Sequence, residues 1–276
     1  MHVGRMGYEQ EGAKLFLTDN ITNATMITER LNKYNKERQT KEKIIYEEAI
    51  EKINSEKEEN SIILCSKGWH HGVIGIVASK ITETYYKPCI LLCEENDEAK
   101  GSGRSVPGFD LHDALCKSSD TLEKYGGHGM AVGLTLKMDQ LDNFKKKFRK
   151  IVEDANLGEL EQVILVDKQV ELKDLNIENI EKIKLLEPFG EGNKVPIFMM
   201  KNLKIDSIRT LSEGKHLKLT LKDGNQVLSA IGFNIGSYAD EFLLDDKVDV
   251  VGQLEINEFG GNKQVQINVK DIRKSY

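Results

Sequence analysis

Residues 126–133 carry the sequence GGHGMAVG, with four glycines and one histidine in eight positions. Glycine lets a backbone approach a ligand closely and adopt conformations that other residues avoid. A loop of exposed N–H groups that also carries a histidine suits an anionic group such as a phosphate. Taken alone, the stretch fits a tight turn with a core histidine better.

Two further motifs lie upstream, GWHHGVIG at residues 68–75 and GSGRS at residues 101–105. Three glycine-punctuated polar motifs within one domain-sized stretch predict one shared site. The chain has 276 residues, enough for two domains, with the apolar and charged content of a globular protein. Its net charge of −6 argues against sequence-blind adhesion to nucleic acid but leaves room for a local basic groove.

No apolar run approaches the roughly 20 residues of a transmembrane helix, and residues 1–10 lack the apolar core of a secretory signal. We therefore expect no membrane partner. The four cysteines show no CxxC zinc spacing, so we interpret them as reduced core thiols of a cytoplasmic protein without metal ligands. The basic run at residues 145–150 fits the solvated face of a helix better than a DNA contact.

Residues 20–58 have the spacing of one long helix that connects domains; two helices with a break near Thr40 are the alternative. An α/β pattern follows. Its expected strands lie at residues 61–66, 88–94, 99–106 and 131–137, and its helices at 73–86, 111–117 and 141–154.

Residues 155–192 are predicted to form a bridge, with a strand at 163–166 and a helix at 177–186. Short strands separated by turn signals follow, at 197–207, 216–221, 226–233, 248–256 and 265–272. This pattern predicts a barrel of the OB type, or else a small sandwich. The expected boundaries are a connector at residues 1–58, an α/β domain at 59–155, a bridge at 156–194 and an OB domain at 195–276.

At residues 68–88, 101–115 and 126–133 the chain resembles the DHH-associated domain of the RecJ exonuclease family. The resemblance continues through LLEPFGEGN at 185–193, HLKLTL at 216–221 and INEFGGNKQVQINVKDIR at 256–273, which are similar to the OB domain of that family. It implies the end of the family's catalytic domain and a long connector helix at residues 1–58. An α/β domain of the DHH-associated type with a mixed sheet and flanking helices is expected to follow, and then an OB-fold barrel.

The resemblance implies the C-terminal part of a 5′-to-3′ single-stranded-DNA exonuclease of DNA repair and recombination. The chain contains no Asp-His-His sequence, so the metal-binding catalytic domain of the family is expected to be missing and this part to be inactive alone. It also implies Mn²⁺ or Mg²⁺ in the parent enzyme and no cofactor in this part. The implied partners are single-stranded DNA and, beyond it, single-strand-binding protein or a RecQ-type helicase.

For the predicted site, Arg104 offers a planar fork of donors that grips a phosphate bidentately. Ser105 adds a hydroxyl contact, and Gly126 and Gly127 allow close backbone approach. His128 donates to a phosphate oxygen or supports the metal site from the opposite wall. The alternative for Arg104 is a structural salt bridge with a residue such as Asp110.

Other candidates are less specific. His70 fits either phosphate binding or a structural role, and Trp69 either stacks on a base or anchors a helix start. Phe259 and Lys263, beside a glycine turn, are candidate contacts to single-stranded DNA. Two other functions stay open: a DHH-type phosphoesterase for short RNA or cyclic dinucleotides, and a non-enzymatic protein-interaction module.

Overall fold

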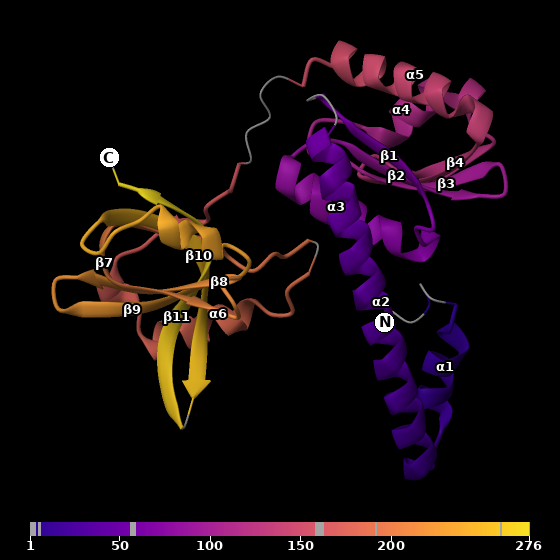
Figure 1. Ribbon diagram of the computed structural model, residues 1–276. Helices are drawn as coiled ribbons and strands as arrows, with labels where there is room; N and C mark the ends of the chain where they lie inside the picture. The colour runs from indigo at the N-terminus through magenta and orange to yellow at the C-terminus, as the bar shows by residue number, and fades with distance from the viewer. Residues whose placement is uncertain are drawn as a thin grey trace. The chain divides into compact units, whose positions relative to one another are not determined.

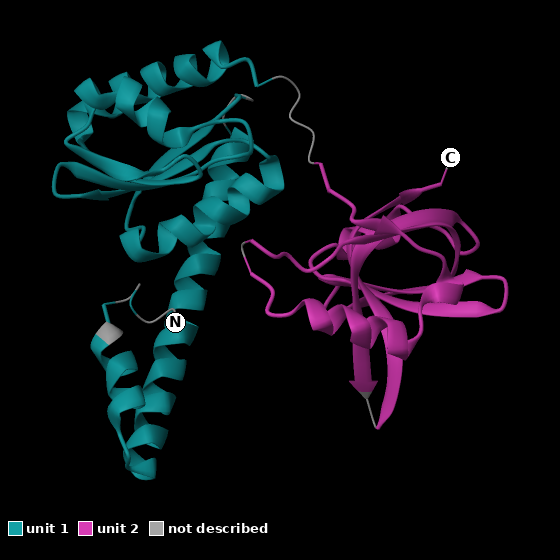
Figure 2. Cartoon of the chain, turned by 180° about the vertical axis from the view of Figure 1, so that it is seen from behind, with its two compact units in different colours: residues 1–162 teal, residues 163–276 magenta. Residues whose placement is uncertain are grey.

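The chain divides into two compact units, residues 1–162 and residues 163–276 (Figure 2). The computed structural model describes residue 4 and residues 7–55, 59–157, 163–190, 192–259 and 261–275, apart from the side chains of Glu9 and Phe259. Each unit has a hydrophobic core of its own. Within the described ranges no helix is both long enough and apolar enough to cross a bilayer.

Unit 1 begins with a pair of helices, α1 (Glu9–Leu17) and α2 (Ile21–Ser55), joined by a short turn (Figure 1). α2 runs through Thr40 without interruption, because its sequence contains neither glycine nor proline. The single long helix predicted from the sequence is therefore confirmed, and the alternative with a break is wrong. α1 was not predicted; it is held to α2 by the ion pair between Glu11 and Arg30, at 3.1 Å.

A five-stranded mixed sheet forms the centre of unit 1, in the order β1-β2-β3-β5-β4. Its strands are β1 (Ile62–Lys67), β2 (Cys89–Glu95), β3 (Glu98–Arg104), β4 (Lys124–His128) and β5 (Ala131–Lys137). β1 and β2 are parallel, and every other neighbouring pair is antiparallel. The mixed sheet confirms the fold class expected from the sequence.

Helices cover the two faces of this sheet unequally. α3 (His71–Tyr85) packs on one face, over β2 and β3, with α2 behind it (Figure 1). α4 (Leu111–Lys117) and α5 (Leu141–Asp154) cover the other face. Asp110 caps α4, since its Oδ1 accepts the Asp113 N–H at 2.9 Å. Consequently β5 and β4 are covered on one face only.

The GGHGMAVG stretch is a β-hairpin and not the loop that its composition predicted. Residues 124–128 form β4, and they pair with β5 through residues 131–135. Only Gly127 needs to be glycine for conformational reasons, since its φ is +136° and a Cβ there would lie 2.3 Å from the Ala131 carbonyl oxygen. The prediction of a loop was wrong because cross-strand hydrogen bonds stabilise glycines that have little strand preference of their own.

Two parts of α2 anchor it to α3. The Trp69 Nε1–H, just before α3, donates to a carboxylate oxygen of Glu48 at 2.7 Å. Further along, Glu42 accepts from Lys80 at 2.5 Å and is also paired with Arg38. Because Arg38 and Glu42 are both buried, this ion-pair group fixes the helix at one position.

Unit 2 begins with a bridge of short elements. These are the strand β6 (Lys168–Gln169), a 3₁₀ turn (Leu172–Asp174), α6 (Ile177–Ile183) and a second 3₁₀ turn (Lys184–Leu186). The strand predicted at residues 163–166 is wrong, since those residues form no strand and the described part of the bridge pairs with β7 through β6. An apolar run predicted a strand there, but the available edge of β7 lies opposite residues 168 and 169.

A barrel of five strands completes unit 2: β7 (Phe198–Leu211), β8 (His216–Asp223), β9 (Gln226–Gly232), β10 (Lys247–Phe259) and β11 (Asn262–Lys274). The order is β7-β8-β9-β11-β10, and β10 pairs again with β7 to close it. β9 and β11 are parallel, and a 3₁₀ helix (Gly236–Asp240) lies between β9 and β10. This is the OB-fold predicted from the sequence.

Candidate functional site

Arg104 is the last residue of β3 and lies on the α3 side of the sheet. Its Nε donates to Ser79 Oγ at 3.1 Å, and its Nη1 donates to Ser102 Oγ at 3.1 Å and to the Gly103 carbonyl at 2.7 Å. α3 approaches β3 closely here, since a Cβ at Gly75 would lie 2.8 Å from Ser102 Oγ. The helix and the strand thus fix the plane of the guanidinium together.

The register of the sheet brings His128 into the same row. Ala131 of β5 pairs with Arg104 on one side and with His128 on the other. Neighbouring strands lie about 4.8 Å apart, so the two outer residues of the row are about 10 Å apart and share a face. His128 Nδ1 accepts the Met130 N–H at 3.3 Å, which places the ring proton on Nε2, where it is available as a donor.

Two more rows follow on the same face. The next contains Ser102, Gly133 and Gly126, and the one after it contains Lys100, Thr135 and Lys124. Sequence reasoning did not select Ser102, Lys100 or Lys124. Strand alternation in the sequence could have identified them. Each lies an even number of residues from Arg104 or His128 along its strand, and such residues share a face.

Two cavities of about 390 Å³ each lie on this side of unit 1. Arg104 lines the first and Ser102 the second, so the hydrogen bond between them marks the boundary. The first is walled mainly by apolar and aromatic groups, including Tyr86, Val106, Pro107 and Met130. The second is lined by Ser102, Gly133 and Thr135 of the sheet, by two lysines, and by His71 and Ile74 of α3.

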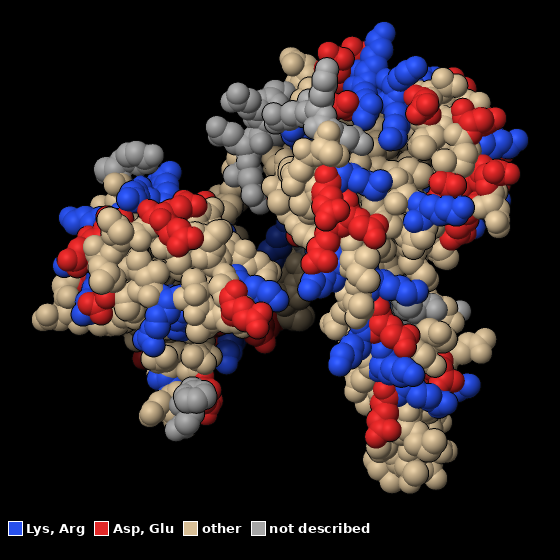
Figure 3. All heavy atoms as spheres, in the orientation of Figure 1, with Lys and Arg blue, Asp and Glu red and all other residues tan. Residues whose placement is uncertain are grey.

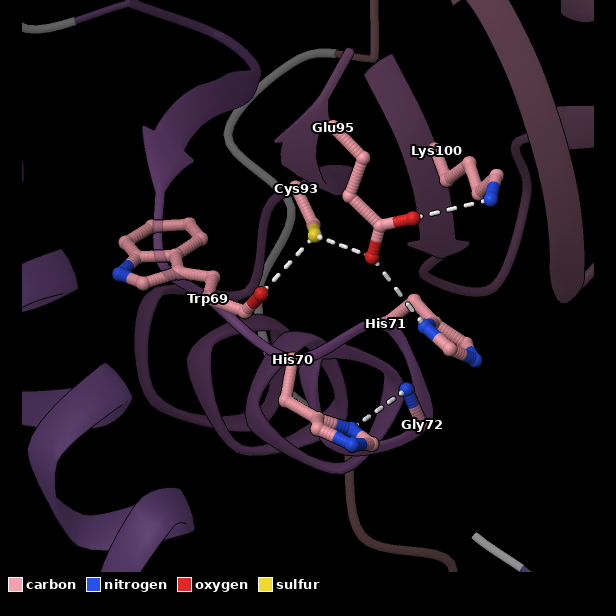
Figure 4. Close-up of polar contacts among 7 residues, drawn as sticks. All are labelled: Trp69, His70, His71, Gly72, Cys93, Glu95 and Lys100. Carbon is pink, nitrogen blue, oxygen red and sulfur yellow. Dashed lines mark hydrogen bonds and ion pairs between the residues drawn. The ribbon is translucent and has the colours of Figure 1, made fainter. Parts of the chain in front are cut away.

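The GWHHG motif builds the start of α3 (Figure 4). His70 is the N-cap of the helix, because its Nδ1 accepts the Gly72 N–H at 3.1 Å. Burial, helped by the positive charge of Lys41, lowers the pKa of His70, so its ring is neutral at pH 7. The structure therefore gives His70 a capping contact.

The neighbouring histidine belongs to a polar cluster. His71 Nδ1 lies 3.5 Å from Glu95, which also accepts from Lys100 Nζ at 2.9 Å (Figure 4). The bond from Lys100 is the chief reason why the pKa of Glu95 is lowered. Beside it, the Cys93 thiol donates to the Trp69 carbonyl at 2.9 Å. The cluster ties α3 to β2 and β3 at the edge of the second cavity.

Trp69 and Ser105 make internal contacts. Trp69 is 4% exposed, and its N–H is bonded to Glu48, so the structure places it in the core. Ser105 lines the first cavity, but its hydroxyl donates to the Phe109 carbonyl at 2.7 Å and its side chain is buried. Ser102, bonded to Arg104, is the better-placed hydroxyl.

In the barrel, Lys263 lies on β11 and is 3.8 Å from Glu258, with about half of its side chain exposed. The side chain of Phe259 lies outside the described residues. A second lysine, Lys218, is half-buried and donates to Ser229 and Gln266 at 2.7 Å, and burial lowers its pKa. On α5 of unit 1, lysine and arginine atoms gather on the surface (Figure 3), as expected for a solvated helix face.

No cluster of three or more His, Cys, Asp or Glu side chains suited to a metal ion occurs among the described residues. The cysteines of that part of the chain are all free thiols. Cys89 and Cys93 are buried as predicted, whereas Cys116 is exposed on α4, which corrects the expectation of four core thiols.

Comparison with known proteins matches both units. Residues 58–154 match the DHHA1 domain family, and residues 166–271 match the RecJ OB domain family. The chain thus joins a DHHA1 domain to a RecJ OB domain.

The chain is 32% identical over 279 residues to the single-stranded-DNA-specific exonuclease RecJ of Bacillus subtilis, covering 99% of this chain and 35% of that protein. It is 31% identical to the protein of the same name from Thermus thermophilus, covering 98% and 38%. The crystal structure of RecJ with Mg²⁺ from T. thermophilus superposes with a TM-score of 0.83 at 27% identity, covering all of this chain and 42% of that one. The chain belongs to the RecJ family and spans less than half the length of these relatives.

Proposed function

We propose that this chain is the substrate-binding part of a 5′-to-3′ exonuclease specific for single-stranded DNA, of the kind used in repair and recombination. The observation that carries the proposal is the row of Arg104, Ala131 and His128. It places a fixed cation and a ring N–H donor on one face of the sheet, where none of the described helices covers β5 and β4. The relatives named above are single-stranded-DNA-specific exonucleases.

Arg104 is proposed to bind the terminal 5′-phosphate. Its bonds to Ser79 and to the Gly103 carbonyl hold the guanidinium plane in one orientation, which positions the cation for a phosphate. Ser102 contributes a hydroxyl beside it, and His128 donates from Nε2 to the same phosphate or the next one. Gly126 and Gly127 keep the backbone of β4 accessible, and the first cavity has the apolar walls that suit a nucleobase.

The Mg²⁺ or Mn²⁺ ions implied by the family do not fit the described residues, which offer no set of ligands for them. Two related RecJ crystal structures are complexes with Mg²⁺ and with Mn²⁺. We propose that the ions that hydrolyse the phosphodiester bond are held by the remainder of the longer protein. On this proposal the present chain binds and orients the strand and does not cleave it alone.

For the barrel we infer a role in binding the part of the single-stranded DNA that follows its 5′ end. Its OB-fold and its exposed Lys263 support this role, because such barrels combine cationic grooves with stacking side chains. Phe259 precedes the turn between β10 and β11 and is proposed as a stacking partner. Docking of a single-strand-binding protein or a RecQ-type helicase on the same barrel is the alternative.

Fluorescence anisotropy with 5′-phosphorylated, 5′-hydroxyl and duplex oligonucleotides over a salt series tests the proposal. We expect salt-dependent binding that prefers the phosphorylated single strand. Arg104→Ala should lower that affinity about tenfold and remove the preference for the phosphate, because a charged hydrogen bond is lost.

Lys146→Ala, on the exposed part of α5, is the matched control for loss of one positive charge and should leave the preference intact. An Arg104→Ala variant with unchanged preference would remove this residue from the site. No binding by the unchanged chain, together with capture of a single-strand-binding protein by the barrel, would favour the docking role.

A further inference from the structure

The second cavity, of about 390 Å³, shares only Ser102 with the proposed terminal-phosphate contacts and carries positive charge of its own. Lys100 of β3 and Lys124 of β4 both line it, from opposite sides of β5. Lys100 is already paired with Glu95 at 2.9 Å. Among the described residues no acidic side chain pairs with Lys124, so Lys124 is the stronger anion site of the two.

The floor between the two sites lacks side chains without any need from the fold. A Cβ at Gly126 would meet no atom within 4 Å, and one at Gly133 would meet only the Gly101 carbonyl oxygen at 4.0 Å. The two glycines pair with each other in register, and neither has the positive φ that requires glycine. Packing therefore does not explain them, whereas a flat ligand lying on the sheet does.

The spacing of the rows sets the length of that ligand. From the Arg104 row to the Lys124 row the sheet advances four residues, which is about 14 Å at roughly 3.4 Å per residue. A single phosphate at Arg104 does not reach Lys124 over that distance. A strand with further phosphates, lying along β5 over the two glycines, does reach it.

The positive strip ends one row further on. There Lys137 of β5 lies opposite Glu98 of β3 and is 3.7 Å from Glu123. Two glutamates surround one lysine here, so this row is not positive and the strip runs from Arg104 to Lys124.

We propose that the second cavity is a subsite for an internal phosphodiester of the bound strand, with Lys124 as its principal contact and Gly126 and Gly133 as the floor beneath the intervening nucleotide. This inference rests on the proposed function, because it takes the terminal phosphate to lie at Arg104. It predicts that the affinity of the chain for a very short DNA strand depends on the number of nucleotides as well as on the 5′-phosphate.

The test is competition of unlabelled ligands against a labelled 5′-phosphorylated oligothymidylate, read by anisotropy, with the whole chain. The competitors are thymidine 5′-monophosphate and the 5′-phosphorylated di- and trinucleotides of thymidine. Lys124→Ala should weaken the trinucleotide about tenfold and leave the monophosphate unchanged, whereas Arg104→Ala should weaken both. For the long oligonucleotide, Lys124→Ala should also reduce the salt slope by about 0.7.

Gly133→Val supplies an independent variant. A β-branched residue in a strand should leave the free energy of unfolding unchanged or raise it, while its side chain blocks the floor and weakens the trinucleotide. Lys146→Ala is again the charge control.

The outcomes separate the two proposals. Suppose that Arg104→Ala removes phosphate recognition, but that Lys124→Ala weakens the monophosphate and the trinucleotide equally or weakens neither of them. The proposed subsite is then wrong, and the proposed function stands. If neither variant changes binding, or the unchanged chain does not bind, both are wrong.

Discussion

Arg104 and His128 come from different strands and are 24 positions apart in sequence, yet both pair with Ala131 in one row of the sheet. Ala131 therefore lies between the guanidinium of Arg104 and the ring N–H donor of His128. Its small side chain leaves room for an anion between them, and it lines the first cavity.

Replacement of Ala131 by Asp should therefore abolish recognition of a 5′-phosphate. A carboxylate at this position repels the ligand and pairs with Arg104 in its place, so we expect an affinity loss of about tenfold or more. Ala131→Ser, of similar size and without charge, should stay within about twofold of the unchanged chain. Anisotropy with phosphorylated and unphosphorylated strands measures both. Equal losses for the two variants would show that packing and not charge decides the effect.

Gly127 and Gly126 should differ in their effect on stability. Gly127→Ala forces a side chain into a left-handed conformation against the Ala131 carbonyl, so we expect a loss of about 2 kcal/mol in the free energy of unfolding. Gly126→Ala meets no neighbouring atom and should be neutral or stabilising. Urea unfolding followed by circular dichroism compares them. A destabilised Gly126→Ala variant would contradict the open floor.

Asp249 should make the stability of the barrel depend on acid. Burial alone would raise its pKa, but the bonds from Ser275 Oγ at 2.6 Å and the Asn202 N–H at 3.2 Å, together with Arg273, lower it. A lowered folded-state pKa means that the carboxylate stabilises the fold above its unfolded pKa of about 3.9. That stabilisation is lost as the pH falls through the folded-state value.

Asp249→Asn should accordingly lower the free energy of unfolding by about 2 kcal/mol at pH 7, with a smaller difference from the unchanged chain at pH 2.5. Hydrogen exchange of amides in β10 and β11 measures the barrel separately from unit 1. Asp245→Asn, at an exposed ion pair with Lys204, should have little effect at either pH. A difference of the same size at both values would exclude titration of Asp249 as the cause.

The thiols should react in an order set by burial. Cys116 is exposed on α4, whereas burial raises the pKa of Cys89, and burial together with Glu95 raises that of Cys93 to about 11. Because the thiolate is the reactive form, iodoacetamide at pH 8 should modify Cys116 first. Mass spectrometry of peptides after brief labelling shows the order, with labelling in urea as the control. Early modification of Cys93 would mean that the start of α3 opens readily.

The length of α2, the OB strands and the α/β elements on either side of GSGRS followed from local patterns. Each of these patterns can be recognised within a short stretch of sequence. They are helical spacing without a break, turn residues, and alternation of apolar and polar residues, and local interactions determine the structure that each one forms. The predicted bounds of α4, α5 and β5 agree with the structure for the same reason. The strand at 163–166 failed because an apolar run forms a strand only where a partner edge is available.

The site divides in the same way. The sequence by itself determined that Arg104, His128 and their glycines belong to one α/β domain, because the three motifs are local and specific. Only the tertiary structure decided that β4 pairs with β5, that Ser102 and not Ser105 lies beside Arg104, and that Lys124 lines the same face. Those relationships depend on cross-strand register and on which face α3 leaves open, and both are set by non-local packing that no short window of sequence contains.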